Sequence, residues 1–162
     1  SASADAGLGT SGTLSYLFIY SILVIGTLGI VTIVAGKGDN ETSLNAFKGL
    51  GKSNPVLAMG MTVLLLAQAG VPLTSGFVAK FGIIRAAVST ESYVLAVVAM
   101  LAAVIAAFLY LRIMVSMWLS EGAASHDVSV AFNTRFAIGL CVGATVALGF
   151  LPSLLLQFTN QI

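Results

Sequence analysis

The chain alternates between long apolar runs and short polar segments. Residues 14–36 contain no charged side chain, whereas residues 37–54 hold several Lys, Asp and Glu residues. Residues 93–119 and 136–158 are two further apolar runs. A bilayer core about 30 Å thick needs about 20 helical residues to cross it. Each of these three runs therefore predicts a transmembrane helix, and the polar segments between them predict loops.

A fourth apolar run, residues 55–90, is too long for one ordinary helix and is interrupted in its middle. The interruption reads AGVPLTSG and contains Gly70, Pro72 and Gly76. Glycine and proline at this density disfavour a continuous helix. Each half offers about 15 residues, or about 22 Å of helix, which is short of a full crossing. We therefore expect one helix broken near 70–76. It is the second of four crossings in an all-α integral membrane fold.

The composition indicates that lipid is the solvent. Hydrophobic residues make up 58% of the 162 residues, charged residues make up 8%, and the mean hydropathy is +1.04. Soluble domains contain about 25% charged residues, and a chain this short could not bury so much apolar surface. The net charge of +1 also excludes the basic field of a nucleic-acid-binding protein.

No cofactor or metal is expected in this chain. It has one cysteine, Cys141, and one histidine, His126, which has no ligand partner at metal-binding spacing. A single cysteine excludes both a disulfide framework and an iron–sulfur cage. No glycine-rich phosphate loop follows a predicted strand, so a bound nucleotide cofactor is not expected either.

The basic residues predict how the chain sits in a bacterial inner membrane. If residues 55–90 cross once, only Arg85 approaches one face. Five basic residues share the other face: Lys37, Lys48, Lys52, Arg112 and Arg135. Basic residues accumulate on the cytoplasmic side. We therefore expect the loops 37–54 and 120–135 in the cytoplasm. The N-terminal tail, residues 1–13, and the C-terminus are expected outside.

Lys80 is the most informative single residue. It lies ten residues before Thr90, about 15 Å from the far end of its segment and so near the bilayer midplane. Placing lysine there costs about 2.5–3.5 kcal/mol, which favours a functional reason for its presence. Burial disfavours the charged form of lysine, so the amine is suited to take up and release a proton. The alternative is a half-buried packing residue whose ammonium reaches the headgroups.

The helix break strengthens the functional interpretation. Backbone groups freed inside a membrane must be buried in protein or line a water-filled cavity, and broken helices often mark ion sites. We expect the residues of the break to form a hinge that lines water beside Lys80: Gln68, Gly70, Pro72, Thr74, Ser75 and Gly76. No span has an Asp or Glu in its interior, so the relay partner of Lys80 is expected from another chain or segment.

Three segments carry a family resemblance. The run AQAGVPLTSGFVAKF resembles the L-A-G-x-P-x-x-x-G-F-x-x-K-F signature of the antiporter-like, proton-translocating membrane subunits of respiratory complex I (NADH-quinone oxidoreductase), with Gln68 in place of the leucine. Upstream, GLGKSNPVLA is similar to the lead-in of that family. Downstream, FLYLRI is similar to its Y-Y-L-R segment. Within the family, the subunit N branch is the most similar.

The resemblance implies a proton-pumping module, with Lys80 as the proton carrier on a discontinuous helix. It implies that NADH, FMN, iron–sulfur clusters and quinone belong to partner subunits, so this non-redox chain holds no complete active site. The chain corresponds to the C-terminal part of a longer fold. Its expected partners are other membrane subunits, including a segment that supplies the upstream helices. Two alternatives remain, namely an Mrp-type cation/proton antiporter subunit and a structural subunit that transports nothing.

Overall fold

The fold is known from a computed structural model that describes residues 2–36, 43–121 and 132–150. Within these ranges the chain forms helices and no strand. In chain order they are α1 (Ala2–Ala35), the 3-10 helix η1 (Leu44–Phe47), α2 (Leu50–Ser53), α3 (Pro55–Ala69), α4 (Ser75–Ser89), α5 (Tyr93–Leu119) and α6 (Phe132–Phe150).

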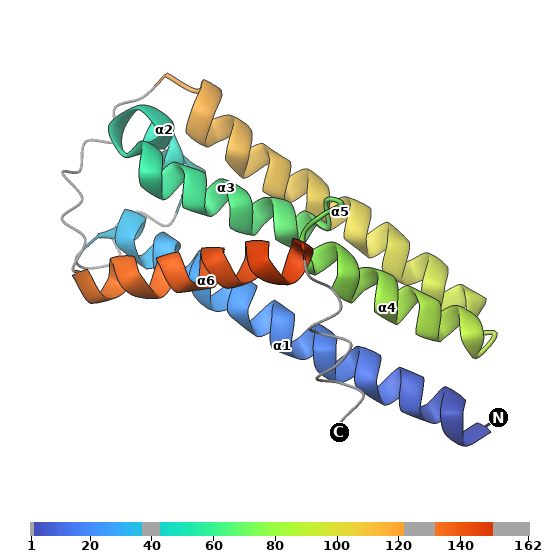
Figure 1. The fold of residues 1–162 in the computed structure, drawn as a ribbon. Helices are drawn as coiled ribbons and strands as arrows, with labels where there is room; N and C mark the ends of the chain where they lie inside the picture. The colour runs from blue at the N-terminus through green and yellow to red at the C-terminus, as the bar shows by residue number, and fades with distance from the viewer. Residues whose placement is uncertain (1, 37–42, 122–131, 151–162) are drawn as a thin grey trace.

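The helices form an elongated bundle in which α3 and α4 lie end to end (Figure 1). Helices α1 and α5 run alongside this pair, and each contacts both halves. Helix α6 packs on α1, α3 and α4. The ends of α1 and α5 and the starts of α3 and α6 lie at one end of the bundle, whereas α4 ends at the other (Figure 1). Together α3 and α4 therefore cover the distance that α1 and α5 each cover alone.

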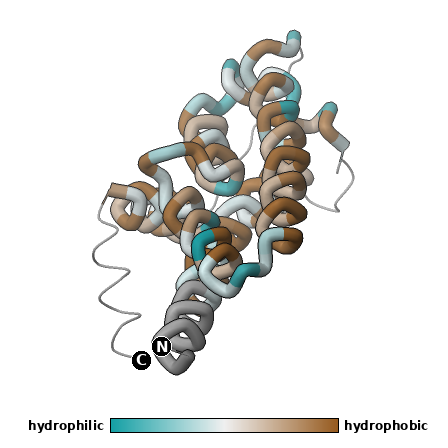
Figure 2. The backbone as a smooth tube through the Cα atoms, turned by 90° about the vertical axis from the view of Figure 1, so that its right-hand side faces the viewer, coloured by the Kyte–Doolittle hydropathy of each residue, from teal (hydrophilic) through white to brown (hydrophobic). Residues whose placement is uncertain are grey.

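The lengths and hydropathies of these helices confirm the predicted all-α integral membrane fold. In the described part of the chain, three segments are long and apolar enough to cross a bilayer: 13–35, 93–119 and 132–150. Helices α3 and α4 have 15 residues each, about 22 Å, and span only as a pair. Hydrophobic residues predominate along the helices (Figure 2). Only 6% of the α5 span is buried inside the protein, so most of α5 is available to lipid.

Local chemistry explains where α3 and α5 begin. The Asn54 side chain accepts a hydrogen bond from the Leu57 N–H at 3.4 Å, and Pro55 occupies the first helical position. At the α4–α5 turn Glu91 has a φ of 57°, and the Ser92 N–H donates to the Ala87 carbonyl at 2.9 Å. This tight turn makes α4 and α5 antiparallel neighbours.

The apolar core is centred on α3. Its most deeply buried side chains come from α1, α3 and α5: Ile30, Met61, Leu64, Leu65 and Met117. At the α1–α6 crossing, a Cβ on Gly26 would lie 2.9 Å from the Cβ of Cys141, so the cysteine serves as a small packing residue. These contacts hold the two halves of the broken crossing between α1 and α5.

The helix ends differ from those expected from hydropathy. Helix α1 begins at Ala2, within the expected tail, and α6 begins at Phe132, within the expected 120–135 loop. The polar 37–54 segment contains η1 and α2. A helix leaving the bilayer keeps its backbone hydrogen bonds, so hydropathy marks the membrane edge and not the helix end. Lys37, His126 and residues 151–158 of the last expected crossing lie outside the described residues.

Candidate functional site

The site is built around the end of α3. Gly70 adopts a φ of 83° in the left-handed region, where glycine is favoured. Its N–H donates to the Ala67 carbonyl at 3.0 Å, and the Val71 N–H donates to the Leu66 carbonyl at 3.1 Å. This pair of bonds is a Schellman motif, and it satisfies two of the four carbonyls left free at the helix end.

Lys80 binds the other two free carbonyl groups at the end of α3. Its Nζ donates to the Gln68 carbonyl at 2.6 Å and to the Ala69 carbonyl at 3.2 Å. The lysine stem passes over Gly70, where an added Cβ would lie 3.1 Å from Lys80 Cδ. The C-terminal end of a helix carries a partial negative charge that favours a cation. An ammonium group from the second half of the crossing therefore caps the backbone of the first half.

Backbone oxygens, and not a carboxylate, hold this ammonium group. In the parts of the chain whose side chains the structure describes, the acidic residues are Glu91 and Glu121. They follow the ends of α4 and α5, away from the break. Lys80 thus has no carboxylate partner within those parts.

The start of α4 is fitted tightly against the end of α3. Thr74 caps α4, since its Oγ1 accepts from the Phe77 N–H at 3.4 Å and donates to the Val71 carbonyl at 2.6 Å. Ser75 is 1% exposed. At Gly76 an added Cβ would lie only 1.8 Å from the Ala67 carbonyl oxygen, so only glycine fits there. The break is therefore a close backbone junction spanning residues 70–74, while Ser75 and Gly76 already belong to α4.

Gln68 connects the break to α1. Its side chain is buried, and its Nε2 donates to the Leu23 carbonyl at 3.2 Å and to the Thr27 hydroxyl oxygen. The sequence places Gln68 beside water as a member of the hinge. In the structure its amide nitrogen joins the last turn of α3 to the middle of α1, and the residue also borders a cavity beside Lys80.

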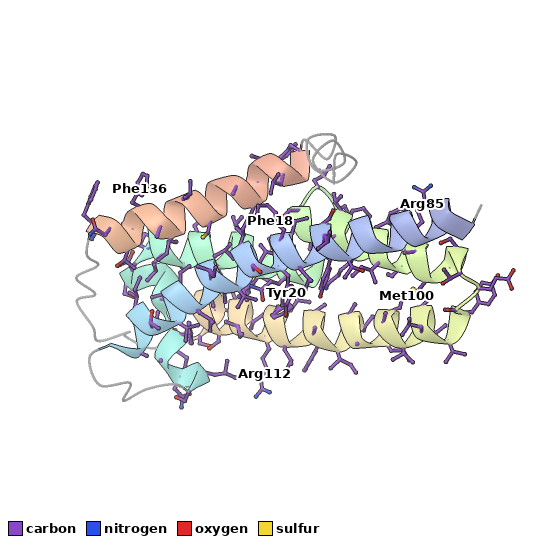
Figure 3. The ribbon with its side chains drawn as sticks, turned by 90° about the horizontal axis from the view of Figure 1, so that it is seen from below. Phe18, Tyr20, Arg85, Met100, Arg112 and Phe136 are labelled. Atoms are coloured by element: carbon purple, nitrogen blue, oxygen red, sulfur yellow. The ribbon has the colours of Figure 1, made fainter. Side chains whose placement is uncertain are left out.

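A cavity of about 320 Å³ opens beside Lys80 between α1, α4 and α5. Its polar lining comes from Gln68, Lys80 and three tyrosines, which are Tyr16, Tyr20 and Tyr110. Its α5 wall is made largely of alanines, namely Ala99, Ala102, Ala103 and Ala106. Figure 3 shows Tyr20 in the space between α1 and α5. Of the six residues expected to line water beside Lys80, Gln68 is the one that borders this cavity, together with Lys80 itself. Pro72 and Thr74 lie outside its lining.

The sequence pattern alone does not single out the three tyrosines as residues of the site. Their spacing along the sequence nevertheless indicates that they share helix faces. Tyr16 and Tyr20 are four residues apart on α1, and Tyr110 lies four residues after Ala106 on α5. Residues four apart share a helix face. Which helix faces meet, however, is decided only by the packing of α1 against α5.

The chain resembles known membrane proteins over most of its length. Residues 2–106 match the model of the family described as NADH:quinone oxidoreductase/Mrp antiporter, TM. A Saccharopolyspora erythraea protein named NADH-quinone oxidoreductase subunit N is 44% identical over 94% of this chain and 30% of its own length. A Mycobacterium tuberculosis protein of the same name is 37% identical over 98% of the chain and 31% of its own length. The chain thus spans about a third of these relatives.

A solved structure has the same fold. A chain of respiratory complex I from Thermus thermophilus superposes with a TM-score of 0.63 at 18% sequence identity. The match covers 90% of the present chain and 45% of the other one.

Proposed function

The chain belongs to the NADH:quinone oxidoreductase/Mrp antiporter membrane family, and from this premise we propose that it is part of a complex I-type membrane subunit in which Lys80 carries protons across the midplane. The observation that carries the proposal is the Lys80 ammonium group, held at a helix break and bordering a cavity. The same residue matches the lysine of the family signature.

The hydrogen bonds of Lys80 are compatible with both protonation states. An ammonium group has three N–H donors, and two of them bind the Gln68 and Ala69 carbonyls. A neutral amine keeps two donors for the same carbonyls and gains a lone pair. The third position is available on the side of the cavity, which Lys80 lines. Loss of the proton therefore leaves no buried carbonyl unsatisfied, and a water molecule in the cavity accepts or returns that proton.

The redox chemistry of such a complex is assigned to other chains in this proposal. NADH, FMN, iron–sulfur clusters and quinone belong to partner subunits, and this chain acts as a non-redox translocase segment. The carboxylate or second base that exchanges protons with Lys80 comes from the upstream helices, because the longer relatives have about three times the length of this chain.

The proposal is tested in the full-length subunit within the assembled complex, reconstituted in vesicles. Lys80→Met and Lys80→Arg should both abolish or strongly reduce proton uptake driven by NADH oxidation, because methionine cannot bind a proton and arginine does not release one. Lys52→Met is the matched control, since this exposed lysine lies on α2. Pumping at the wild-type rate in both Lys80 variants would refute the role of Lys80 and favour a structural subunit.

The family description also includes Mrp antiporters, and the same vesicles distinguish that candidate. Exchange of Na⁺ or K⁺ for protons, without NADH oxidation, would identify a cation/proton antiporter. Transport driven only by NADH:quinone turnover supports the complex I assignment.

The proposed orientation in a bacterial inner membrane follows from charge. Lys48 and Lys52 precede α3, and Arg112 on α5 points outward from the bundle, whereas Arg85 lies toward the end where α4 ends (Figure 3). Basic ends favour the cytoplasm. In a Cys141→Ser background, Lys52→Cys should react with an impermeant maleimide from the cytoplasmic side only. Thr90→Cys should react from the opposite side only, and the reverse pattern would invert the proposed orientation.

A further inference from the structure

Three tyrosine side chains from two helices converge on the cavity that contains Lys80. Tyr16 and Tyr20 are stacked on α1 with ring centroids 5.4 Å apart and planes inclined by 12°. Tyr110 lines the same space from α5. Tyr20 and Tyr110 therefore border, from two different helices, the cavity that Lys80 also lines.

Tyr20 and Tyr110 lie deeper in their spans than interfacial anchors do. Tyr110 lies nine residues before the end of α5 at Leu119, or about 14 Å. Tyr20 lies seven residues after the start of its apolar span at Thr13, or about 10 Å. Interfacial tyrosines gather at headgroup level, whereas a hydroxyl group at this depth needs a partner. Phenylalanine would fill the same volume without that need.

The α5 wall keeps the space beside the hydroxyl groups open. Apart from Tyr110, the α5 residues that line the cavity are four alanines, and larger side chains at the same positions would fill it. A volume of about 320 Å³ holds several water molecules, and Lys80, Gln68 and the tyrosines supply the polar partners that ordered water needs.

We propose that Tyr20 and Tyr110 are proton-transfer residues that connect Lys80 to the water of this cavity. The inference rests on the proposed role of Lys80 and assigns the path by which its proton arrives and leaves. In the outward step, the Lys80 N–H bond breaks as a new O–H bond forms at a water molecule or a tyrosine hydroxyl group. That hydroxyl group passes its original proton to the next oxygen, so Lys80 becomes neutral and each tyrosine ends the step neutral.

Single hydroxyl deletions test the path in the full-length subunit of the assembled complex in vesicles. Tyr20→Phe and Tyr110→Phe should each lower the number of protons pumped per NADH oxidised, because each removes a hydroxyl group that donates and accepts protons along the path. Tyr93→Phe is the matched control, because Tyr93 is exposed at the start of α5 and outside the cavity. Wild-type pumping in both cavity variants would overturn the inference.

Comparing the Phe variants with Lys80→Met distinguishes failure of the tyrosine path from failure of the proposed function. If Lys80→Met stops pumping while both Phe variants pump normally, the tyrosine path fails and the role of Lys80 stands. If Lys80→Met also pumps normally, the proposed function itself fails. Should a Phe variant not assemble, 3-fluorotyrosine at position 20 or 110 keeps the shape and makes the hydroxyl group more acidic. A shift of the pH profile of pumping to lower pH supports the path, and an unchanged profile overturns it.

Discussion

Lys80 on α4 donates a hydrogen bond of 2.6 Å to the backbone carbonyl of Gln68 on α3. This contact joins the two halves of the broken crossing, since a side chain from the second half binds the free helix end of the first. The Schellman motif at Gly70 pairs the Leu66 and Ala67 carbonyls and leaves the Gln68 and Ala69 carbonyls to the lysine. The break is thus fully hydrogen-bonded at the end of α3.

Lys80→Met should lower stability modestly while it removes function. It deletes two hydrogen bonds from a charged donor, each of which contributes about 1.5–3 kcal/mol. Removing a lysine from the middle of a membrane helix returns about 2.5–3.5 kcal/mol. The return offsets only part of the loss, so we expect the thermal midpoint of the purified subunit to lie a little below that of the wild type and of Lys52→Met. A large drop in the midpoint would instead make Lys80 a structural cap.

Gly76→Ala should destabilise the junction between α3 and α4. The new methyl group would lie 1.8 Å from the Ala67 carbonyl oxygen, and backbone cannot move aside as a flexible side chain can. Overpacking of this kind typically costs about 1–3 kcal/mol. Gly82→Ala on the same helix is the control, because nothing lies within 4 Å of its added Cβ. Equal stability of the two variants, measured by thermal unfolding in detergent, would contradict the close junction.

Gly70→Ala should lower both stability and pumping. An alanine at a φ of 83° costs about 1–2 kcal/mol, and its Cβ would press on Lys80 Cδ at 3.1 Å. Asparagine tolerates the left-handed region better, so Gly70→Asn should lose less stability. Gly60→Ala on α3 meets only ordinary contacts at 3.7 Å or more and serves as the control. A Gly70→Ala variant as stable as Gly60→Ala would mean that the turn has another conformation.

Gln68→Leu should loosen the contact between α3 and α1. It removes the donor to the Leu23 carbonyl and to the Thr27 hydroxyl group. Side-chain hydrogen bonds between membrane helices contribute about 0.6 kcal/mol on average. A double-mutant cycle with Thr27→Val should recover a coupling of that size. A coupling of zero would show that the two side chains do not interact in the membrane.

Filling the cavity should slow proton transfer without unfolding the bundle. Ala106→Leu projects a larger side chain into the space that Lys80 and Tyr110 line. We expect pumping in vesicles to fall because water is displaced, whereas Ala106→Ser keeps the space and should pump normally. Equal pumping by the two variants would show that proton transport does not depend on the open cavity.

Several features of the fold were predictable because their causes are local. A run of about 20 apolar residues has few alternatives to a membrane helix, and Gly70 with Pro72 disfavours helix in the middle of 55–90. The structure narrows the break to residues 70–74, since Thr74 caps α4 and Ser75 already begins it. The hinge and water-lining roles expected for these residues remain predictions. The cavity includes Gln68 from that set, beside Lys80, and leaves Pro72 and Thr74 outside its lining.

The sequence by itself determined the number of crossings, the position of the break and the presence of a lysine beside it, because hydropathy and backbone preference act over neighbouring residues. Tertiary structure decided what that lysine binds and what surrounds it. Tyr20, Lys80 and Tyr110 belong to three different helices, and no local pattern brings them together. They line one cavity because α1, α4 and α5 pack side by side and the alanines of α5 leave room between them.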